Sequence, residues 1–233
     1  MLDEMLKTGR VWCGQHSGGQ RSGGQRSGGQ RSGGQHASEQ AAGLPSGFAE
    51  LDQRLPQGGW PRDGVTEVLC QAPGMGEFSL LQPALAQASQ SGCVALVCPP
   101  FALHLPALTQ DIRQENLLVI QPTAQHRQWA LEQVLSSGCC AALVFWAQHA
   151  PEFSVYRRLQ ILCLQHQVAA FFLLREEKAN TPCRLRLQLT SAESKASTLT
   201  LRLLKGQGIW GQRQVLLPRG PFAAQAPLRY PLL

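Results

Sequence analysis

The sequence has no long apolar run. No stretch approaches the roughly 20 residues that a membrane-spanning helix requires, and the N-terminal segment lacks the apolar stretch of a signal peptide. We therefore expect a cytoplasmic protein that makes no contact with a membrane. The 233 residues, 43% of them hydrophobic, suit one domain of ordinary size plus appendages.

The cysteines and histidines lack the spacing of a metal site. The sequence has eight cysteines but no C-x-x-C pair, and its six histidines are scattered without a recurring partner. Most cysteines lie in or beside apolar segments, where reduced cysteine packs as a small hydrophobe. These are Cys70, Cys93, Cys98, Cys139, Cys140 and Cys163. We expect no metal and no other cofactor.

A phosphate-binding loop is present in outline but lacks its functional side chains. A working loop reads G-x-x-x-x-G-K-[ST]: backbone N–H groups cradle the phosphates, the lysine neutralises their charge and the hydroxyl holds magnesium. Here Gly76 stands at the last glycine, but Gln71 replaces the first glycine, Glu77 the lysine and Phe78 the hydroxyl. Gly74, Gly76 and a following helix could still shape the turn. Because a carboxylate repels a triphosphate, we expect no NTP hydrolysis.

A second part of NTPase chemistry is also missing. A carboxylate that orients magnesium should end an apolar strand, yet the run from Ala141 to Phe145 continues into Trp146. The two losses are independent and agree. The sequence therefore predicts a protein that is shaped like an NTPase but is not an enzyme.

Apolar runs of strand length alternate with helical patterns from Leu44 onward. The predicted strands are Gly64–Leu69, Cys93–Cys98, Leu117–Ile120, Ala141–Trp146 and Val168–Leu174. The predicted helices are Phe78–Ser89, Leu103–Gln110, Gln125–Ser136 and Phe153–Gln167. The strands are apolar on both faces, which is typical of a parallel sheet covered by helices. We predict an α/β fold with a mostly parallel sheet over residues 44–180.

The pattern changes to a period of two after Lys178. Leucines alternate with polar residues, which predicts antiparallel strands with one polar, partly arginine-bearing face outward. Residues 181–233 hold eight basic residues and the single acid Glu193, which gives this region a net charge of +7. The whole chain has a net charge of +6, so the rest of it is nearly neutral. The candidate contacts with single-stranded DNA or an acidic partner are Arg184, Arg186, Arg202, Lys205 and Arg213. Solubility and protection of an edge strand explain the same charges equally well.

Residues 1–43 form a separate N-terminal part. Residues 17–35 repeat Ser-Gly-Gly-Gln four times with arginines between the copies, which predicts a disordered, mildly basic linker. RNA binding is the alternative, but the repeats lack interleaved aromatic residues. Ahead of them, Asp3–Trp12 could form a short helix, and Val11 and Trp12 are candidates for a tethered docking peptide. A frayed terminus is the simpler explanation.

The segment before the degenerate loop resembles RecA-like proteins. Their Thr/Ser-Gly, Leu-Asp, paired-glycine and Pro-x-Gly elements have counterparts here at Ser46-Gly47, Leu51-Asp52, Gly58-Gly59 and Pro61 to Gly64. A short helix from Phe48 to Leu55 would bury its apolar residues, and the glycine pair would permit the reversal into the first strand. The resemblance implies a RecA-like fold.

A more specific resemblance is to the ImuA family of bacterial mutagenic translesion synthesis. It is carried by Gly58-Gly59-Trp60-Pro61-Arg62 leading to Thr66-Glu67, by Pro73-Gly74-Met75-Gly76-Glu77, and by Cys98-Pro99-Pro100. Val11-Trp12 also resembles a short element of that family. The resemblance covers Leu44 to Leu174 and implies a noncatalytic adaptor of the SOS response. The implied partners are an ImuB-like polymerase homologue, RecA and the error-prone DNA polymerase III alpha subunit.

The same core is also similar to the SulA family of cell-division inhibitors, chiefly over Gln125–Trp146. There a helix, a Ser-Gly corner and an apolar strand ending in tryptophan recur. This resemblance implies a protein that blocks FtsZ polymerisation. Both families belong to the response to DNA damage, so the two resemblances agree on the cellular context and differ on the molecular role.

Overall fold

The computed structural model describes residues 11–13, 43–72, 74–100, 111–147, 149–178, 180–191, 198–206 and 213–218. The strands are β1 (Val11–Cys13), β2 (Gly64–Cys70), β3 (Cys93–Val97), β4 (Leu117–Ile120), β5 (Cys140–Ala147), β6 (Ala169–Leu174), β7 (Leu185–Ser191), β8 (Thr198–Lys205) and β9 (Arg213–Pro218). Within these residues they form one sheet in the order β1-β4-β3-β5-β6-β2-β7-β8-β9. Adjacent strands are parallel throughout the central part of the sheet, which runs in the order β4-β3-β5-β6-β2-β7.

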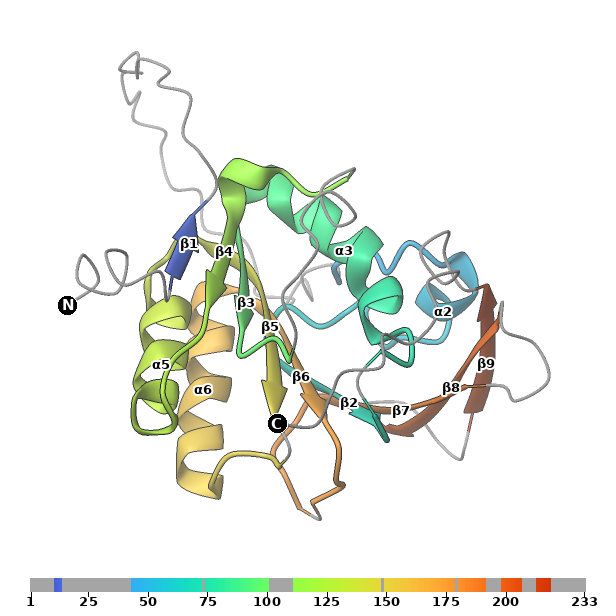
Figure 1. The fold of residues 1–233 in the computed structure, drawn as a ribbon. Helices are drawn as coiled ribbons and strands as arrows, with labels where there is room; N and C mark the ends of the chain where they lie inside the picture. The colour runs from blue at the N-terminus through green and yellow to red at the C-terminus, as the bar shows by residue number, and fades with distance from the viewer. Residues whose placement is uncertain are drawn as a thin grey trace, which may run out of the picture.

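Helices cover both faces of the sheet (Figure 1). The α-helices are α2 (Ala49–Asp52), α3 (Glu77–Ser91), α5 (Arg127–Ser136) and α6 (Phe153–His166), and short 3₁₀ turns span Gln114–Asn116 and Ala124–His126. α5 and α6 lie side by side on one face, while α3 and α2 lie on the other (Figure 1). No helix in the described part of the chain is both long and apolar enough to cross a membrane.

The central strands are buried because both of their faces meet helices. Every residue of β2 and of β6 is buried, and the core divides into one cluster beneath α3 and another beneath α5 and α6. Trp60 is fully buried in the first cluster, where its ring meets Phe171 edge-on at 5.4 Å between centroids. The five predicted strands and three of the predicted helices are confirmed to within a few residues. The predicted helix Leu103–Gln110 lies outside the described residues.

The lead-in to β2 is held by contacts of its small and acidic residues. The backbone N–H of Ser46 donates to Asp52 Oδ1 at 2.9 Å, which ties the start of the segment to α2. Gly47 has a φ of +83°, and a Cβ there would lie 2.3 Å from the Cβ of Pro83 on α3. Only glycine suits both the left-handed backbone and this close approach.

The C-terminal strands extend the same sheet. β7 pairs in parallel with β2, whereas β8 and β9 are each antiparallel to the strand before them. The antiparallel arrangement predicted beyond residue 180 is therefore right for β8 and β9, but β7 also continues the parallel part. The sequence boundary between residues 180 and 181 does not interrupt the sheet.

The N-terminal prediction is wrong where the structure describes it. Val11–Cys13 is not the end of a helix over Asp3–Trp12, because it forms β1 and pairs antiparallel with β4, with Trp12 opposite Val119. A pairing between segments so far apart leaves no local signal in the sequence. Residues 3–10, the repeat at 17–35 and the proline-containing tail lie outside the described residues.

Candidate functional site

The degenerate phosphate loop is a turn between a strand and a helix. It joins the carboxyl end of β2 to the start of α3, with Gly74 at φ +84° and Gly76 at φ +107°. Gly76 is the N-cap of α3, so the free N–H groups of the first helical turn point toward the loop. A loop of this form attracts an anion through its N–H groups and the helix dipole.

The anion in this turn is the protein's own Glu77. Its Oε1 accepts a hydrogen bond from the N–H of Gly74 at 2.8 Å, and its Oε2 accepts one from the N–H of Gly76 at 3.1 Å. The residue is only 2% exposed. We expected this carboxylate to face a triphosphate and repel it. Instead it folds back and uses two of the N–H groups with which a phosphate would bond.

The other two substitutions in the loop have different surroundings. Gln71 is exposed at the end of β2, whereas Phe78 is half-buried and packs against the core beneath α3. An aromatic ring therefore lies where a working loop has the hydroxyl that holds magnesium. Within the described chain, no group of three or more His, Cys, Asp or Glu side chains could hold a metal ion.

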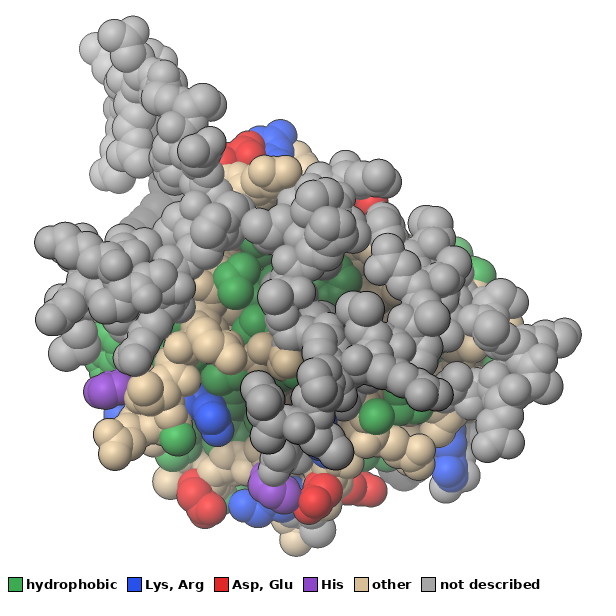
Figure 2. Space-filling model, in the orientation of Figure 1, with side chains coloured by type: hydrophobic (Ala, Val, Ile, Leu, Met, Phe, Trp, Pro, Cys, Tyr) green, Lys and Arg blue, Asp and Glu red, His purple; other side chains and the backbone are tan. Residues whose placement is uncertain are grey.

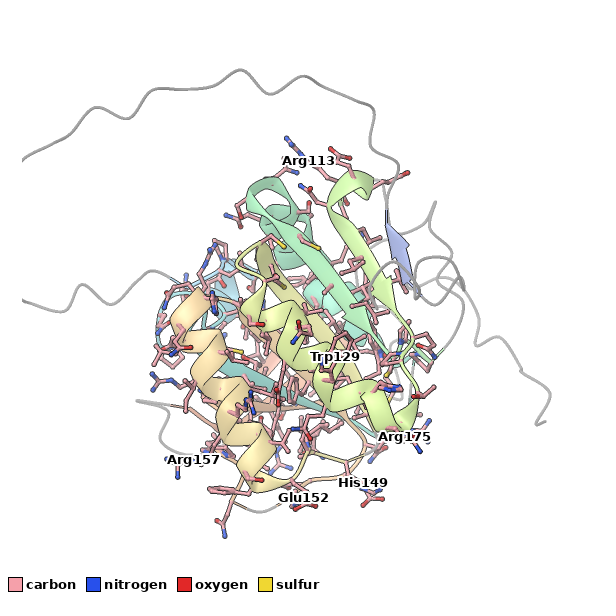
Figure 3. The ribbon with its side chains drawn as sticks, turned by 90° about the vertical axis from the view of Figure 1, so that its left-hand side faces the viewer. Arg113, Trp129, His149, Glu152, Arg157 and Arg175 are labelled. Atoms are coloured by element: carbon pink, nitrogen blue, oxygen red, sulfur yellow. The ribbon has the colours of Figure 1, made fainter. Side chains whose placement is uncertain are left out.

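A cavity of about 840 Å³ lies at the carboxyl ends of the parallel strands. Glu77 lines one part, and Cys98, Arg127, Trp146, Glu152 and Arg175 are among the other lining residues. Carboxyl strand ends are the usual place for ligands in open α/β sheets. Figure 3 shows His149, Glu152 and Arg175 at this end, near the start of α6 and the end of β6.

Trp146 occupies the strand end at which a magnesium-orienting acid was sought. It is 8% exposed, lines the cavity, and its indole N–H has no hydrogen-bond partner. Across the cavity, Cys98 follows β3 with a φ of +55°. Burial raises the pKa of its thiol, and the neighbouring Arg127 guanidinium partly offsets that rise. None of these groups supplies the missing carboxylate.

Comparison with known proteins identifies the architecture. No family model and no curated protein matches the sequence. The crystal structure of the RadB recombinase is similar, with a TM-score of 0.60 and 14% sequence identity over 74% of this chain and 94% of that chain. The fold is RecA-like. At this identity the similarity establishes the fold alone, and it confirms the predicted RecA-like, mostly parallel sheet with flanking helices.

The basic residues predicted on β7 to β9 of this RecA-like fold do not share one environment. Arg184 is partly exposed and pairs with Asp63 at 2.6 Å, and Lys205 Nζ donates to the carbonyl of Thr181 at 2.7 Å. Arg202 is half-buried on β8. Arg213 begins β9, and its side chain lies outside the described residues. Contact of these residues with DNA or a partner stays a prediction.

Arg186 does not face outward as the alternating pattern predicted. Its side chain is 8% exposed, and its Nε donates to Glu67 Oε2 at 2.6 Å. It also donates to Glu177 at 2.8 Å and to the hydroxyl of Thr181. The Tyr156 hydroxyl on α6 donates to the second oxygen of Glu67 at 2.9 Å. The outward placement of Arg186 is therefore wrong, because β7 is covered by the loop that follows β6.

Charged side chains also gather on the surface around that loop. Figure 2 shows acidic, basic and histidine side chains along the lower edge of the molecule, below the strand ends of Figure 1. His149 Nδ1 lies 3.1 Å from Glu176 Oε2, and both side chains are mostly exposed. This pair links the loop before α6 to the loop after β6, on the rim of the cavity.

The predicted docking residues Val11 and Trp12 lie in β1, at the edge of the RecA-like sheet. Their backbones are paired with Ile120 and Val119 of β4. No predicted site includes the buried Glu67 and Tyr156, although an acid within the strand-length run Gly64–Leu69 was a visible signal. A buried carboxylate requires a partner, and its partner is 119 residues away in the sequence.

Proposed function

We propose that this chain is a noncatalytic RecA-like accessory protein of SOS mutagenesis, acting as an adaptor in error-prone translesion DNA synthesis. The observation that carries the noncatalytic part is the Glu77 carboxylate, which accepts hydrogen bonds from Gly74 and Gly76 inside the phosphate-loop turn. A nucleotide would have to displace a buried, hydrogen-bonded anion before its own phosphates could bind. Trp146 at the end of β5 is consistent with the same proposal.

The adaptor role rests on the resemblance of Leu44–Leu174 to the ImuA family. The proposed partners are an ImuB-like polymerase homologue, RecA and the error-prone DNA polymerase III alpha subunit. A RecA-like body could offer RecA a surface of the kind that RecA subunits offer each other. Single-stranded DNA is a further candidate through Arg202 and the other basic residues of the last strands.

Titration with ATP and Mg²⁺ tests the noncatalytic part. The full-length protein should show neither heat of binding by calorimetry nor phosphate release at millimolar ATP. Micromolar binding with steady hydrolysis would reject the proposal. A matched pair of variants then examines the turn itself.

Glu77→Lys with Phe78→Thr restores the cation and the hydroxyl, whereas Glu77→Ala only empties the turn. If the loop has kept a phosphate cradle, the double variant should bind ATP with Mg²⁺ at least about tenfold more tightly than Glu77→Ala. Equal affinities would show that the turn no longer accepts phosphates.

Purified partners test the adaptor part. The full-length protein should form a complex with the ImuB-like polymerase homologue or RecA that is stable in gel filtration. The similarity of Gln125–Trp146 to the SulA family supplies the competing outcome, namely suppression of FtsZ assembly. Suppression of FtsZ assembly without either complex would replace the adaptor role by division inhibition.

A further inference from the structure

The outer side of α6 carries an unusual group of exposed apolar residues. In the described part of the chain, the large hydrophobic side chains exposed by about half are Phe153 at 52%, Ile161 at 51%, Leu164 at 49% and Leu216 at 56%. Three of these four belong to α6. Single exposed apolar side chains are ordinary, but a group of them on one helix is a candidate interaction surface.

These side chains form a stripe along the helix. At about 100° per residue, Phe153, Arg157, Ile161 and Leu164 fall within roughly a quarter of the helix circumference. The buried residues Tyr156, Leu159 and Cys163 lie on a different side, against the sheet. We call Phe153, Arg157, Ile161 and Leu164 the α6 stripe. Because the buried side already fixes the helix, the α6 stripe is free to contact another molecule.

Arg157 gives the α6 stripe a charge. Its guanidinium carbon lies 6.0 Å from the centre of the Phe153 ring, and it has no ion pair among the described residues. The next residue, Arg158, differs because its Nη2 lies 3.2 Å from Glu132 of α5. Figure 3 shows Arg157 on the outer side of α6, away from the sheet. An apolar stripe with an uncompensated cation is complementary to an apolar surface that carries an acid.

The position of Arg157 disfavours a second copy of this chain as the partner. In a symmetric antiparallel contact centred on the α6 stripe, the two Arg157 side chains would lie within about one helical turn of each other. Like charges at that distance oppose association. A partner with an acidic residue opposite Arg157 avoids this repulsion and neutralises the cation.

We propose that the α6 stripe binds an amphipathic helix of a partner protein, with an acidic side chain of that helix paired to Arg157. The apolar face of the partner helix would cover Phe153, Ile161 and Leu164, as in other complexes in which one amphipathic helix packs on an apolar surface. The proposal does not depend on the phosphate-loop turn. Failure of one proposal would leave the other intact.

The test uses the full-length protein and synthetic helical peptides of 18 residues. Four peptides share a Leu/Phe face and carry Glu beside it in four different registers, and four matched peptides carry Lys instead. Fluorescence anisotropy should show at least one Glu peptide binding about tenfold or more tightly than its Lys counterpart. Arg157→Glu should reverse that preference.

Two further variants distinguish binding at the α6 stripe from nonspecific binding to exposed apolar side chains. Ile161→Ser with Leu164→Ser should abolish binding, whereas Leu216→Ser on β9 removes an equally exposed side chain and should leave binding unchanged. Circular dichroism at increasing temperature verifies that each variant is folded. Absence of binding by all eight peptides, equal binding of the Glu and Lys peptides, or equal losses in the two variants would overturn the proposal. A dimer dispersed by Ile161→Ser, or binding to anionic vesicles but not to peptides, would also overturn it.

Discussion

At the scale of single residues, Glu77 determines the charge of the phosphate-loop turn. A lysine at this position would point toward a ligand, whereas the glutamate turns back and bonds to the loop backbone. One substitution thus removes the cation and also supplies an internal anion. Gly74 and Gly76 keep the left-handed backbone that makes their N–H groups available.

Replacing Glu77 should therefore cost stability. Glu77→Ala should lower the free energy of unfolding by about 1–2 kcal/mol, because two backbone donors lose a charged acceptor in a partly buried turn. Glu77→Gln should cost less, since one amide oxygen remains to accept. Urea denaturation of the three proteins measures both differences. An unchanged or higher stability of Glu77→Ala would contradict the role assigned to the carboxylate.

At the scale of elements, Glu67 and Arg186 join β2 to β7. The two residues are directly opposite in the parallel pairing, and both side chains are buried. Through Glu177 and Thr181, Arg186 also holds the segment that connects β6 to β7. The ion pair thus fastens β7 to β2 and holds the loop that follows β6.

Removing one partner of this pair should be far more damaging than removing both. Arg186→Met should lower the free energy of unfolding by about 3–5 kcal/mol, because Glu67 would remain as a buried, unpaired charge. Adding Glu67→Leu should recover much of that loss. The control is Arg184→Met at the more exposed pair with Asp63, which should cost no more than about 1 kcal/mol. Equal losses at the two arginines would contradict the buried-pair interpretation.

The sequence predicted best the helices and strands whose own residue pattern identifies them. The runs at Cys93–Cys98 and Ala141–Trp146 are apolar on both faces, and this pattern alone indicates a buried parallel strand. The sequence shows directly that Glu77 stands where a working loop has lysine. It does not show that this carboxylate accepts hydrogen bonds from the N–H groups of Gly74 and Gly76, because those contacts depend on atomic positions. The inward turn of Arg186 depends on a carboxylate 119 residues away, which period-two alternation does not reveal.

At the scale of the whole molecule, a single sheet runs through the parallel core and the C-terminal strands. The sequence divided the chain into residues 44–180 and 181–233, yet β2 contacts β6 on one side and β7 on the other. Leu187 and Leu201 belong to the same apolar cluster as Leu85 and Phe171. The two sequence regions therefore share one core.

We expect this shared core to unfold in a single step. Differential scanning calorimetry of the full-length protein should show one transition, whose calorimetric and van't Hoff enthalpies agree. Leu187→Ala on β7 and Leu85→Ala on α3 should each lower the temperature of that same transition. A separate, earlier transition that responds only to Leu187→Ala would indicate that the C-terminal strands fold on their own.

The buried thiols should make the whole fold sensitive to alkali. Burial raises the pKa of Cys70, Cys140 and Cys183, and it raises the pKa of Cys163 to about 12 from a model-compound value of 9.0. Between these two values the unfolded chain releases protons that the folded chain retains. Unfolding is therefore favoured progressively as the pH rises above about 9, whereas these thiols leave stability unchanged below that pH.

The expected loss is as much as about 1.4 kcal/mol per pH unit for each thiol that titrates only in the unfolded state. Urea midpoints at pH 7.5 and pH 10.5, measured with a reductant, provide the comparison. Cys163→Ala should reduce the dependence on pH. Cys139→Ala, at an exposed thiol, is the matched control variant. A pH dependence that is unaltered by Cys163→Ala would contradict the assignment.

The internal carboxylate in the turn after β2 also has a consequence for regulation. Glu77 is attached to the chain, so its local concentration is constant and independent of the cellular nucleotide pool. If the turn excludes nucleotide, as proposed, nucleotide exchange cannot time the action of this protein. Under the proposed function, the amount of protein made and degraded after DNA damage would set the duration of its action.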